Sequence, residues 1–117
     1  MGHVYVEAKL TSPTTSISVN TEALVDAGAT FTTIPKCISE NLKLPQITER
    51  RVKTASGEET LPESYLMIEI LSEKTTTPVL ISDRLDRTLI GALTLEALAL
   101  RVDPKTGKLE KTELLLL

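Results

Sequence analysis

Short apolar runs with period-two alternation dominate this chain and direct it toward a mostly β fold. Between His3 and Leu10 every second residue is apolar, which predicts a strand with one buried face. Further short segments have strand character, with turn residues between them: 17–25, 47–54, 60–71, 75–82 and 89–91. Only 35–44 and 94–100 have helical character. Many short strands with one or two short helices predict a small closed barrel or a sandwich.

A few residues are expected to mark the limits of these elements. Pro35 suits the first position of the first helix, and Thr94 is the expected N-cap of the second. Pro78 lacks a backbone N–H, which predicts that the strand 75–82 lies at an edge or carries a bulge. Residues 55–58 combine small side chains with a glycine between two strands, which is typical of a hairpin tip.

Length, charge and hydropathy limit the partners and the location. The 117 residues, 1–117, suggest one domain, and a domain this small buries only about two-thirds of its unfolded surface, so a partner subunit would help it. A net charge of −3, no basic run and 3% aromatic residues argue against a nucleic-acid surface. We expect neither a signal peptide nor a membrane span, since no stretch approaches about 20 apolar residues, and we expect a cytoplasmic location.

The sequence contains few residues that could support metal binding or thiol chemistry. Cys37 is the only cysteine and His3 the only histidine, so the chain cannot form an intrachain disulfide or a typical zinc site. Catalysis by a Cys–His pair would require His3, near the N-terminus, to reach Cys37. We expect Cys37 to fill space, and we expect no metal and no cofactor.

One acidic residue ends a buried strand. Residues 23–30 read ALVDAGAT, in which Asp26 follows an apolar pair and begins a tight turn. Gly28 is expected to adopt backbone angles that a side chain would forbid, and the two neighbouring alanines leave room for another backbone. A second apolar–apolar–glycine unit, LIGA at 89–92, comes later and leads directly into the second helix.

This arrangement resembles the retropepsin-like aspartic proteases, which comprise retroviral proteases and their cellular and archaeal relatives. The resemblance covers nearly the whole chain, and it rests on three runs in the family's order and spacing: ALVDAGAT at 23–30, VKTASGEETL at 52–61 and TLIGALTLEAL at 88–98. It implies a small closed β-barrel of the retropepsin-like type. The first run would form the catalytic loop, the second a flap over bound peptide, and the third would pack beneath the loop.

The resemblance also implies a function and a set of site residues. The chain would be a homodimeric aspartic endopeptidase in which Asp26 of each subunit is the catalytic residue. The residues that bind substrate would lie in the loop and at the flap tip: Gly28, Ala29, Ala55, Ser56 and Gly57.

The chemistry of this site is consistent with one acid per chain. Peptide hydrolysis without metal, Ser or Cys requires a base to activate water and an acid to protonate the leaving group. Two carboxylates about 3 Å apart share one proton and can do both. Asp83, Asp86 and Asp103 lie in polar turns, so the second carboxylate would be Asp26 of another copy, on a two-fold axis. The expected partners are therefore a second copy and a peptide or protein substrate, without nucleic acid or membrane.

The C-terminal run Leu114 to Leu117 allows two interpretations. Four leucines are costly in water, because burying each one contributes about 1.5–3 kcal/mol. They could cover the barrel of their own chain, or they could pack between subunits, which would support the dimer.

The loop departs from the family pattern at one position. Members usually read Asp-Thr-Gly or Asp-Ser-Gly, and their hydroxyl forms a hydrogen bond across the dimer axis, whereas this chain has Ala27. Two hydrogen bonds of about 0.5–1.5 kcal/mol each would be lost, unless Thr30 substitutes locally. The alternative function is therefore a catalytically weak or inactive relative that acts as a peptide-binding or dimerisation module.

Other positions bear on subfamily and substrate. Retroviral members often carry an Asp and an Arg at the places of Thr30 and Ala92, so the chain resembles a cellular or archaeal relative more than a viral enzyme. Glu58 and Glu59 in the flap allow two interpretations. They could simply keep the hairpin solvated, or they could give the site a mild bias against acidic peptides.

Overall fold

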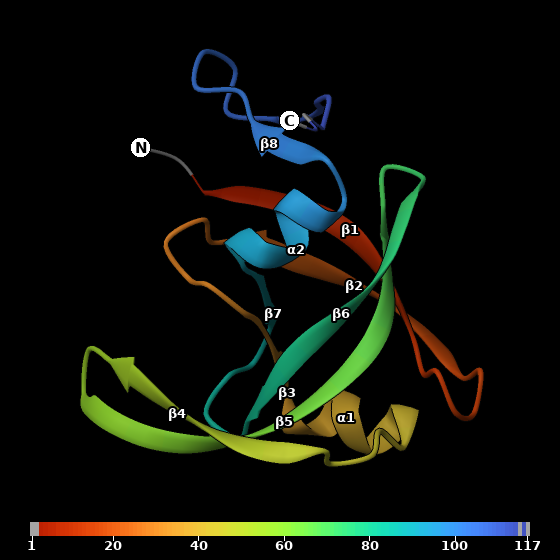
Figure 1. The fold of residues 1–117 in the computed structure, drawn as a ribbon, viewed down its shortest axis with the longest axis vertical. Helices are drawn as coiled ribbons and strands as arrows, with labels where there is room; N and C mark the ends of the chain where they lie inside the picture. The colour runs from red at the N-terminus through yellow and green to blue at the C-terminus, as the bar shows by residue number, and fades with distance from the viewer. Residues whose placement is uncertain (1–2, 115, 117) are drawn as a thin grey trace.

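Six strands close into a small barrel in the computed structural model, which describes residues 3–114 and 116 (Figure 1). Around the ring the order is β1-β2-β7-β3-β6-β5, and the pairing of β5 with β1 closes it. The strands of the ring have these bounds: β1 Val4–Thr11, β2 Ser18–Val25, β3 Thr32–Pro35, β5 Gly57–Ile70, β6 Glu73–Ser82 and β7 Thr88–Ile90. With two short helices, α1 (Lys36–Leu42) and α2 (Ala92–Ala97), this confirms the predicted mostly β closed barrel.

The interior of the barrel is filled by the apolar residues of the alternating strands. In β1, Ala8 and Leu10 are buried while Glu7 and Lys9 are exposed, as the period-two pattern predicts. The fully buried large aliphatic side chains come from the strands, from α1 and from the residue that follows α2: Leu10, Ile34, Leu42, Leu66, Ile68, Ile70, Val79, Ile90 and Leu98. This single core holds the ends of β2 and β7 in fixed positions, and the candidate site lies at those ends.

A hairpin extends out of the barrel from β5. The first part of β5 pairs with β4 (Thr48–Thr54) and the last part with β6, so the β4–β5 end projects away from the core (Figure 1). Thr54 pairs with Gly57, so Ala55 and Ser56 form a two-residue tip, as predicted. Gly57 has φ +120°, a conformation that favours glycine, and the Thr54 hydroxyl donates to its carbonyl at 3.0 Å.

Both helices begin elsewhere than predicted. Pro35 is the last residue of β3 and lies before α1, which begins at Lys36. The second helix begins at Ala92 with Gly91 as its N-cap, so the prediction that Thr94 caps it is wrong. Thr94 lies within α2, and its hydroxyl forms hydrogen bonds with other buried side chains instead.

Three strands were not predicted as such: β3, β8 (Leu100–Val102) and β9 (Leu109–Lys111). Each is three or four residues long, too short for a clear alternation. The prediction for Pro78 is wrong in that β6 is an internal strand of the sheet. However, the pairing of β6 with β3 begins at Val79, so at Pro78 the strand has a partner only on the β5 side.

Beyond the barrel the chain forms the separate β8–β9 sheet, and Thr112 N–H donates to the Ala99 carbonyl at 2.8 Å. Of the four terminal leucines, Leu114 is 67% and Leu116 is 96% exposed, so these two do not cover the barrel of their own chain. Leu115 and Leu117 lie outside the described residues. No helix in the part of the chain described here has the length and apolarity to cross a membrane.

Candidate active site

Asp26 lies immediately after β2, where β2 runs parallel to β7. The last pair of this ladder joins Val25 to Ile90, and the Asp26 N–H donates to the Ile90 carbonyl at 2.9 Å. β7 in turn contacts β3 through the pair Thr33–Leu89. The acid therefore leaves the sheet from a backbone that is held by the strand beside it.

The turn after Asp26 is closed by two hydrogen bonds to this residue. The Ala29 N–H donates to the Asp26 carbonyl at 3.1 Å, and the Gly28 N–H donates to Oδ1 of the carboxylate at 3.2 Å. The side chain of Asp26 is half-buried, whereas Ala27 and Gly28 are exposed at the tip of the loop. The carboxylate is thus oriented by its own loop and lies beside a backbone that another molecule can reach.

The reason expected for Gly28 is wrong. Its φ does not lie in the left-handed region, which only Gly57 and Gly107 occupy among the described glycines. A Cβ at position 28 would lie 3.4 Å from Oδ1 of Asp26, which is close to van der Waals contact. Unlike Gly91, this position therefore leaves room for a Cβ.

The later glycine unit packs beneath the loop, as predicted. A Cβ at Gly91 would lie 2.5 Å from the carbonyl carbon of Phe31 and 2.8 Å from the carbonyl oxygen of Thr30. Just past it, the Ala92 N–H donates to Ala29 at 2.7 Å and the Leu93 N–H to Thr30 at 3.0 Å. The start of α2 therefore supports residues 29–31 through backbone contacts.

Three buried threonines connect this support to the barrel, and of these the sequence analysis singled out only Thr94, as a helix cap. The Thr94 hydroxyl of α2 lies 2.7 Å from that of Thr32 in β3 and 2.8 Å from that of Thr77 in β6. Thr32 Oγ1 also accepts a hydrogen bond from the Gly91 N–H at 3.1 Å. Since all three side chains are almost fully buried, this network fixes α2 against the strands that follow the loop.

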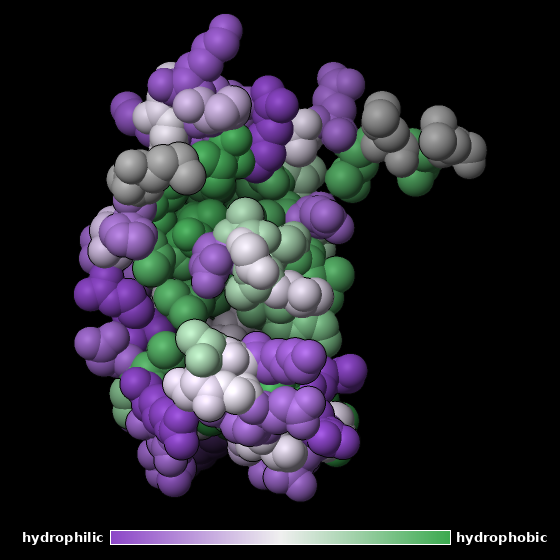
Figure 2. Space-filling view, turned by 90° about the vertical axis from the view of Figure 1, so that its left-hand side faces the viewer, coloured by the Kyte–Doolittle hydropathy of each residue, from purple (hydrophilic) through white to green (hydrophobic). Residues whose placement is uncertain are grey.

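A cleft of about 680 Å³ separates the loop from the projecting hairpin. Its lining comes from the loop (Gly28, Ala29, Thr30 and Phe31), from the hairpin (50–54, Ser56, Glu59 and Leu61) and from the barrel side (Thr33, Leu80, Ser82, Arg84, Leu85 and Leu89). In Figure 1 the loop after β2 and the tip of the β4–β5 hairpin lie on the same side of the molecule. Figure 2 shows that side with apolar side chains gathered between polar regions.

Solved structures with this architecture include two foamy viral proteins, although no protein-family model and no curated protein match the sequence. The structure of simian foamy virus (mac) protease aligns with a TM-score of 0.59 and 25% identity over 79% of this chain and 91% of its own. The foamy viral protease-reverse transcriptase in complex with an RNA/DNA hybrid aligns with a TM-score of 0.62 and 19% identity over 80% of this chain. This chain spans only 12% of that longer protein.

The chain has the retropepsin-like aspartic protease fold. Its closeness to cellular and archaeal members stays a prediction, because both solved structures are viral and share little sequence with it.

The retropepsin-like fold brings most of the predicted site residues to one place. Gly28, Ala29 and Ser56 line the cleft, while Asp26 adjoins it in the same loop. Ala55 and Gly57 flank Ser56 at the exposed tip and are not part of the cleft lining.

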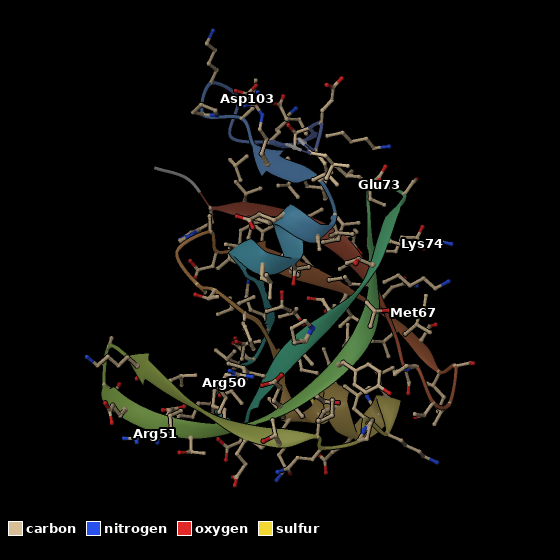
Figure 3. All side chains as sticks on the ribbon, in the orientation of Figure 1. Arg50, Arg51, Met67, Glu73, Lys74 and Asp103 are labelled. Atoms are coloured by element: carbon tan, nitrogen blue, oxygen red, sulfur yellow. The ribbon has the colours of Figure 1, made fainter. Side chains whose placement is uncertain are left out.

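The other three aspartates lie outside the loop that carries Asp26. Asp103 accepts a hydrogen bond from the Lys105 N–H at 2.9 Å in the β8–β9 turn, which Figure 3 shows far from the hairpin that carries Arg50. Asp83 and Asp86 are exposed in the segment between β6 and β7. Among residues 3–114 and 116, no group of three His, Cys, Asp or Glu side chains is placed to hold a metal ion.

Thr30 does not replace the missing loop hydroxyl beside Asp26. Its side chain is exposed, and its backbone carbonyl accepts the Leu93 N–H. Within the described part of the chain, no side-chain hydrogen bond joins the Thr30 hydroxyl to Asp26, whose Oδ1 accepts from Gly28 instead. The local support of the carboxylate therefore comes from the loop backbone.

The charges around the cleft were also not apparent from the sequence. Glu58 forms an ion pair with Arg51 at 2.8 Å and Glu59 with Arg84 at 3.4 Å, so neither acid is a free negative charge on the flap. Arg50 lies 5.0 Å above the centre of the Phe31 ring. The mild bias against acidic peptides that these glutamates suggested is therefore not supported by the charges of the structure.

Proposed function

We propose that this protein is a homodimeric aspartic endopeptidase. The observation that carries the proposal is the position of Asp26, the only aspartate in the loop beside the cleft of a retropepsin-like fold. One carboxylate cannot act as both base and acid on the same bond at the same time, and a second copy supplies the other.

The exposed surface around the site supports pairing of two copies. Ala27 and Gly28 form the exposed tip of the loop, where a two-fold axis would bring the two loops together. Leu114 and Leu116 are exposed on the C-terminal segment, and Leu93 at the start of α2 is 39% exposed. Burying such side chains between subunits would contribute about 1.5–3 kcal/mol each, which is a substantial driving force for a domain this small.

In the proposed reaction the two Asp26 carboxylates hold one proton and one water between them. The unprotonated carboxylate takes a proton from the water as its oxygen attacks the peptide carbonyl, and the protonated carboxylate donates to the carbonyl oxygen. As the C–N bond breaks, the carboxylate that took the water proton passes it to the leaving nitrogen, and the other carboxylate takes a proton from a hydroxyl of the gem-diol, which restores the singly protonated pair. Gly28 and Ala29 would line the peptide backbone, and Ala55, Ser56 and Gly57 would close the flap over it.

Ala27 favours a second candidate function. Without a hydroxyl at the loop tip, two hydrogen bonds of about 0.5–1.5 kcal/mol each are missing from the proposed axis. Since catalysis is sensitive to small displacements, the same cleft could retain a peptide without cutting it. The second candidate is therefore a peptide-binding or dimerisation module with weak or no activity.

A cleavage assay tests the proposal against this alternative. The protein is incubated with a mixed peptide library between about pH 3 and 7, and the products are identified by mass spectrometry. We expect cleavage by the wild type and none by Asp26→Asn. Cleavage that survives this substitution would show that Asp26 is not the catalyst. Peptide retention without cleavage by either form would favour the binding module.

A further inference from the structure

The charge of the cleft is opposite in sign to that of the whole protein. The chain has a net charge of −3. The cleft lining includes four cations, Arg50, Arg51, Lys53 and Arg84, and one acid, Glu59. With Glu63 and Glu58, which pair with Arg50 and Arg51, the local balance is four positive charges against three negative ones. Figure 3 shows Arg50 and Arg51 on the β4–β5 hairpin, with Arg51 nearer its tip.

In all three ion pairs that the cleft arginines form, the arginine is more exposed than its glutamate partner. Arg50 donates through Nε to Glu63 at 2.6 Å, and the side chain of Glu63 is 12% exposed against 51% for Arg50. Arg84 donates through one terminal nitrogen to Glu59 at 3.4 Å, with 24% of Glu59 and 72% of Arg84 exposed. Each of these hydrogen bonds uses one nitrogen of the guanidinium group, and the exposed remaining nitrogens can donate to a ligand.

The other two cations add to this surface. Arg51 is 79% exposed and pairs with Glu58, which is not part of the cleft lining. Lys53 lines the cleft next to the tip, and no ion pair among the described residues involves it. Exposed guanidinium and ammonium groups around a partly apolar cleft attract carboxylates and repel cationic side chains.

We infer that the substrates of this cleft are peptides with acidic side chains, held by Lys53, Arg84 and the arginines of the hairpin. This inference rests on the proposed function, because it takes the cleft to be where the peptide lies. In a two-fold dimer the cationic set occurs twice, so acidic residues would be favoured on both sides of the bond that is cut.

The test compares binding of peptide twins that differ only in Glu against Gln. Binding is measured by fluorescence anisotropy on Asp26→Asn, at low salt and neutral pH, for library peptides and their twins. We expect the Glu peptide to bind about three- to ten-fold more tightly, as two or three exposed ion pairs would give, and we expect 0.5 M salt to remove most of this preference.

A charge-matched pair of variants locates the effect. Lys53→Gln with Arg84→Gln removes two positive charges from the cleft and should reduce the Glu preference to less than about two-fold. Lys9→Gln with Lys74→Gln removes two positive charges from a shallow groove elsewhere, lined by β1, β5 and β6, and should leave the preference unchanged. Circular dichroism and thermal melts check that both variants are folded.

The possible failures of the two proposals are distinct. Equal binding of the twins, no binding of either peptide, or the same loss in both double variants would overturn the acidic-substrate inference. Cleavage by the wild type without any Glu preference would overturn it while leaving the endopeptidase intact. A clear Glu preference in binding without cleavage by the wild type would confirm it and overturn the endopeptidase.

Discussion

At the scale of single residues, Gly91 and Gly28 differ in what a methyl group would meet. At position 91 it would lie 2.5 Å from a backbone carbon of Phe31, whereas at position 28 it would lie 3.4 Å from a carboxylate oxygen. Backbone held by hydrogen bonds on both sides cannot yield easily, whereas the end of a side chain can. The two glycines therefore have different structural roles although both flank the same loop.

The substitution Gly91→Ala should lower the free energy of unfolding by about 1–3 kcal/mol, because residues 30 and 31 or the start of α2 must move. Gly28→Ala should change it by less. Chemical denaturation of both variants measures the difference. Equal stability of Gly91→Ala and wild type would contradict the close approach of these two segments.

The buried threonine network makes a second prediction at this scale. Thr94→Val keeps the shape of the side chain but leaves the hydroxyls of Thr32 and Thr77 without their shared partner, so stability should fall by about 1–3 kcal/mol. Thr76→Val, at an exposed position of β6, is the control and should have little effect. A similar small change in both variants would show that the network does not stabilise the fold.

The positions of the critical residues could be predicted from the sequence better than their structural roles. Asp26 and Gly91 could be found because each interrupts an apolar run. The reason for Gly28 was predicted incorrectly, since a glycine in a turn suggests unusual backbone angles, whereas its φ lies outside the left-handed region and a Cβ would meet a carboxylate oxygen only at van der Waals distance. The threonine network could not be predicted, because its three members belong to separate elements that only the closed barrel brings together.

At the scale of elements, the β4–β5 hairpin differs from the rest of the sheet. All residues of β4 except Val52 are exposed. Residues 57–62 of β5 pair only with β4, so this part of the ladder has no third strand beside it. Segments with few buried apolar contacts open locally at low free energy cost. The hairpin is therefore suited to move relative to the cleft that it borders.

Hydrogen exchange should show this difference. Amides of residues 51–60 should exchange at least about ten-fold faster than those of 64–70 in the same strand system, and bound peptide should slow the former selectively. Mass spectrometry with peptide-level resolution measures both. Equal protection of the two regions, with no effect of peptide, would argue against a flap.

Elements with clear periodicity were predicted well, and short ones were not. The hairpin and the strands β1, β5 and β6 follow from alternation and turn residues, within a few positions at their ends. The strands β3 and β8 are too short for a pattern, and the predicted helix 94–100 included Leu100, the first residue of β8, because leucine favours helices. Tertiary pairing, rather than local preference, decides these segments.

At the scale of the whole molecule, the exposed leucines of the C-terminal segment predict self-association. Replacing both Leu114 and Leu116 with Ser should raise the dimer dissociation constant about ten-fold or more, because apolar area buried between subunits is lost. Met67→Ser is the control, since Met67 is also exposed but lies on β5 away from the C-terminal segment (Figure 3). Analytical ultracentrifugation measures both, and an unchanged dissociation constant would exclude these leucines from the interface.

The missing loop hydroxyl makes a further prediction at this scale. Ala27→Thr should tighten the dimer or raise kcat/KM, because it would restore hydrogen bonds across the proposed axis. Sedimentation and a peptide-cleavage assay measure the two effects. If neither changes, the loops do not need that contact, and the backbone bonds around Asp26 are sufficient to position it.

The central claim is that two copies of Asp26 form one active site, and mixing wild-type chains with Asp26→Asn chains tests it most directly. The chains are allowed to exchange subunits at a fixed total concentration, and peptide cleavage is followed as the wild-type fraction is varied. If both carboxylates are needed, activity should follow the square of that fraction, falling to about a quarter at equal amounts. Activity that falls in simple proportion, to about half, would show that each chain acts alone and would contradict the shared site.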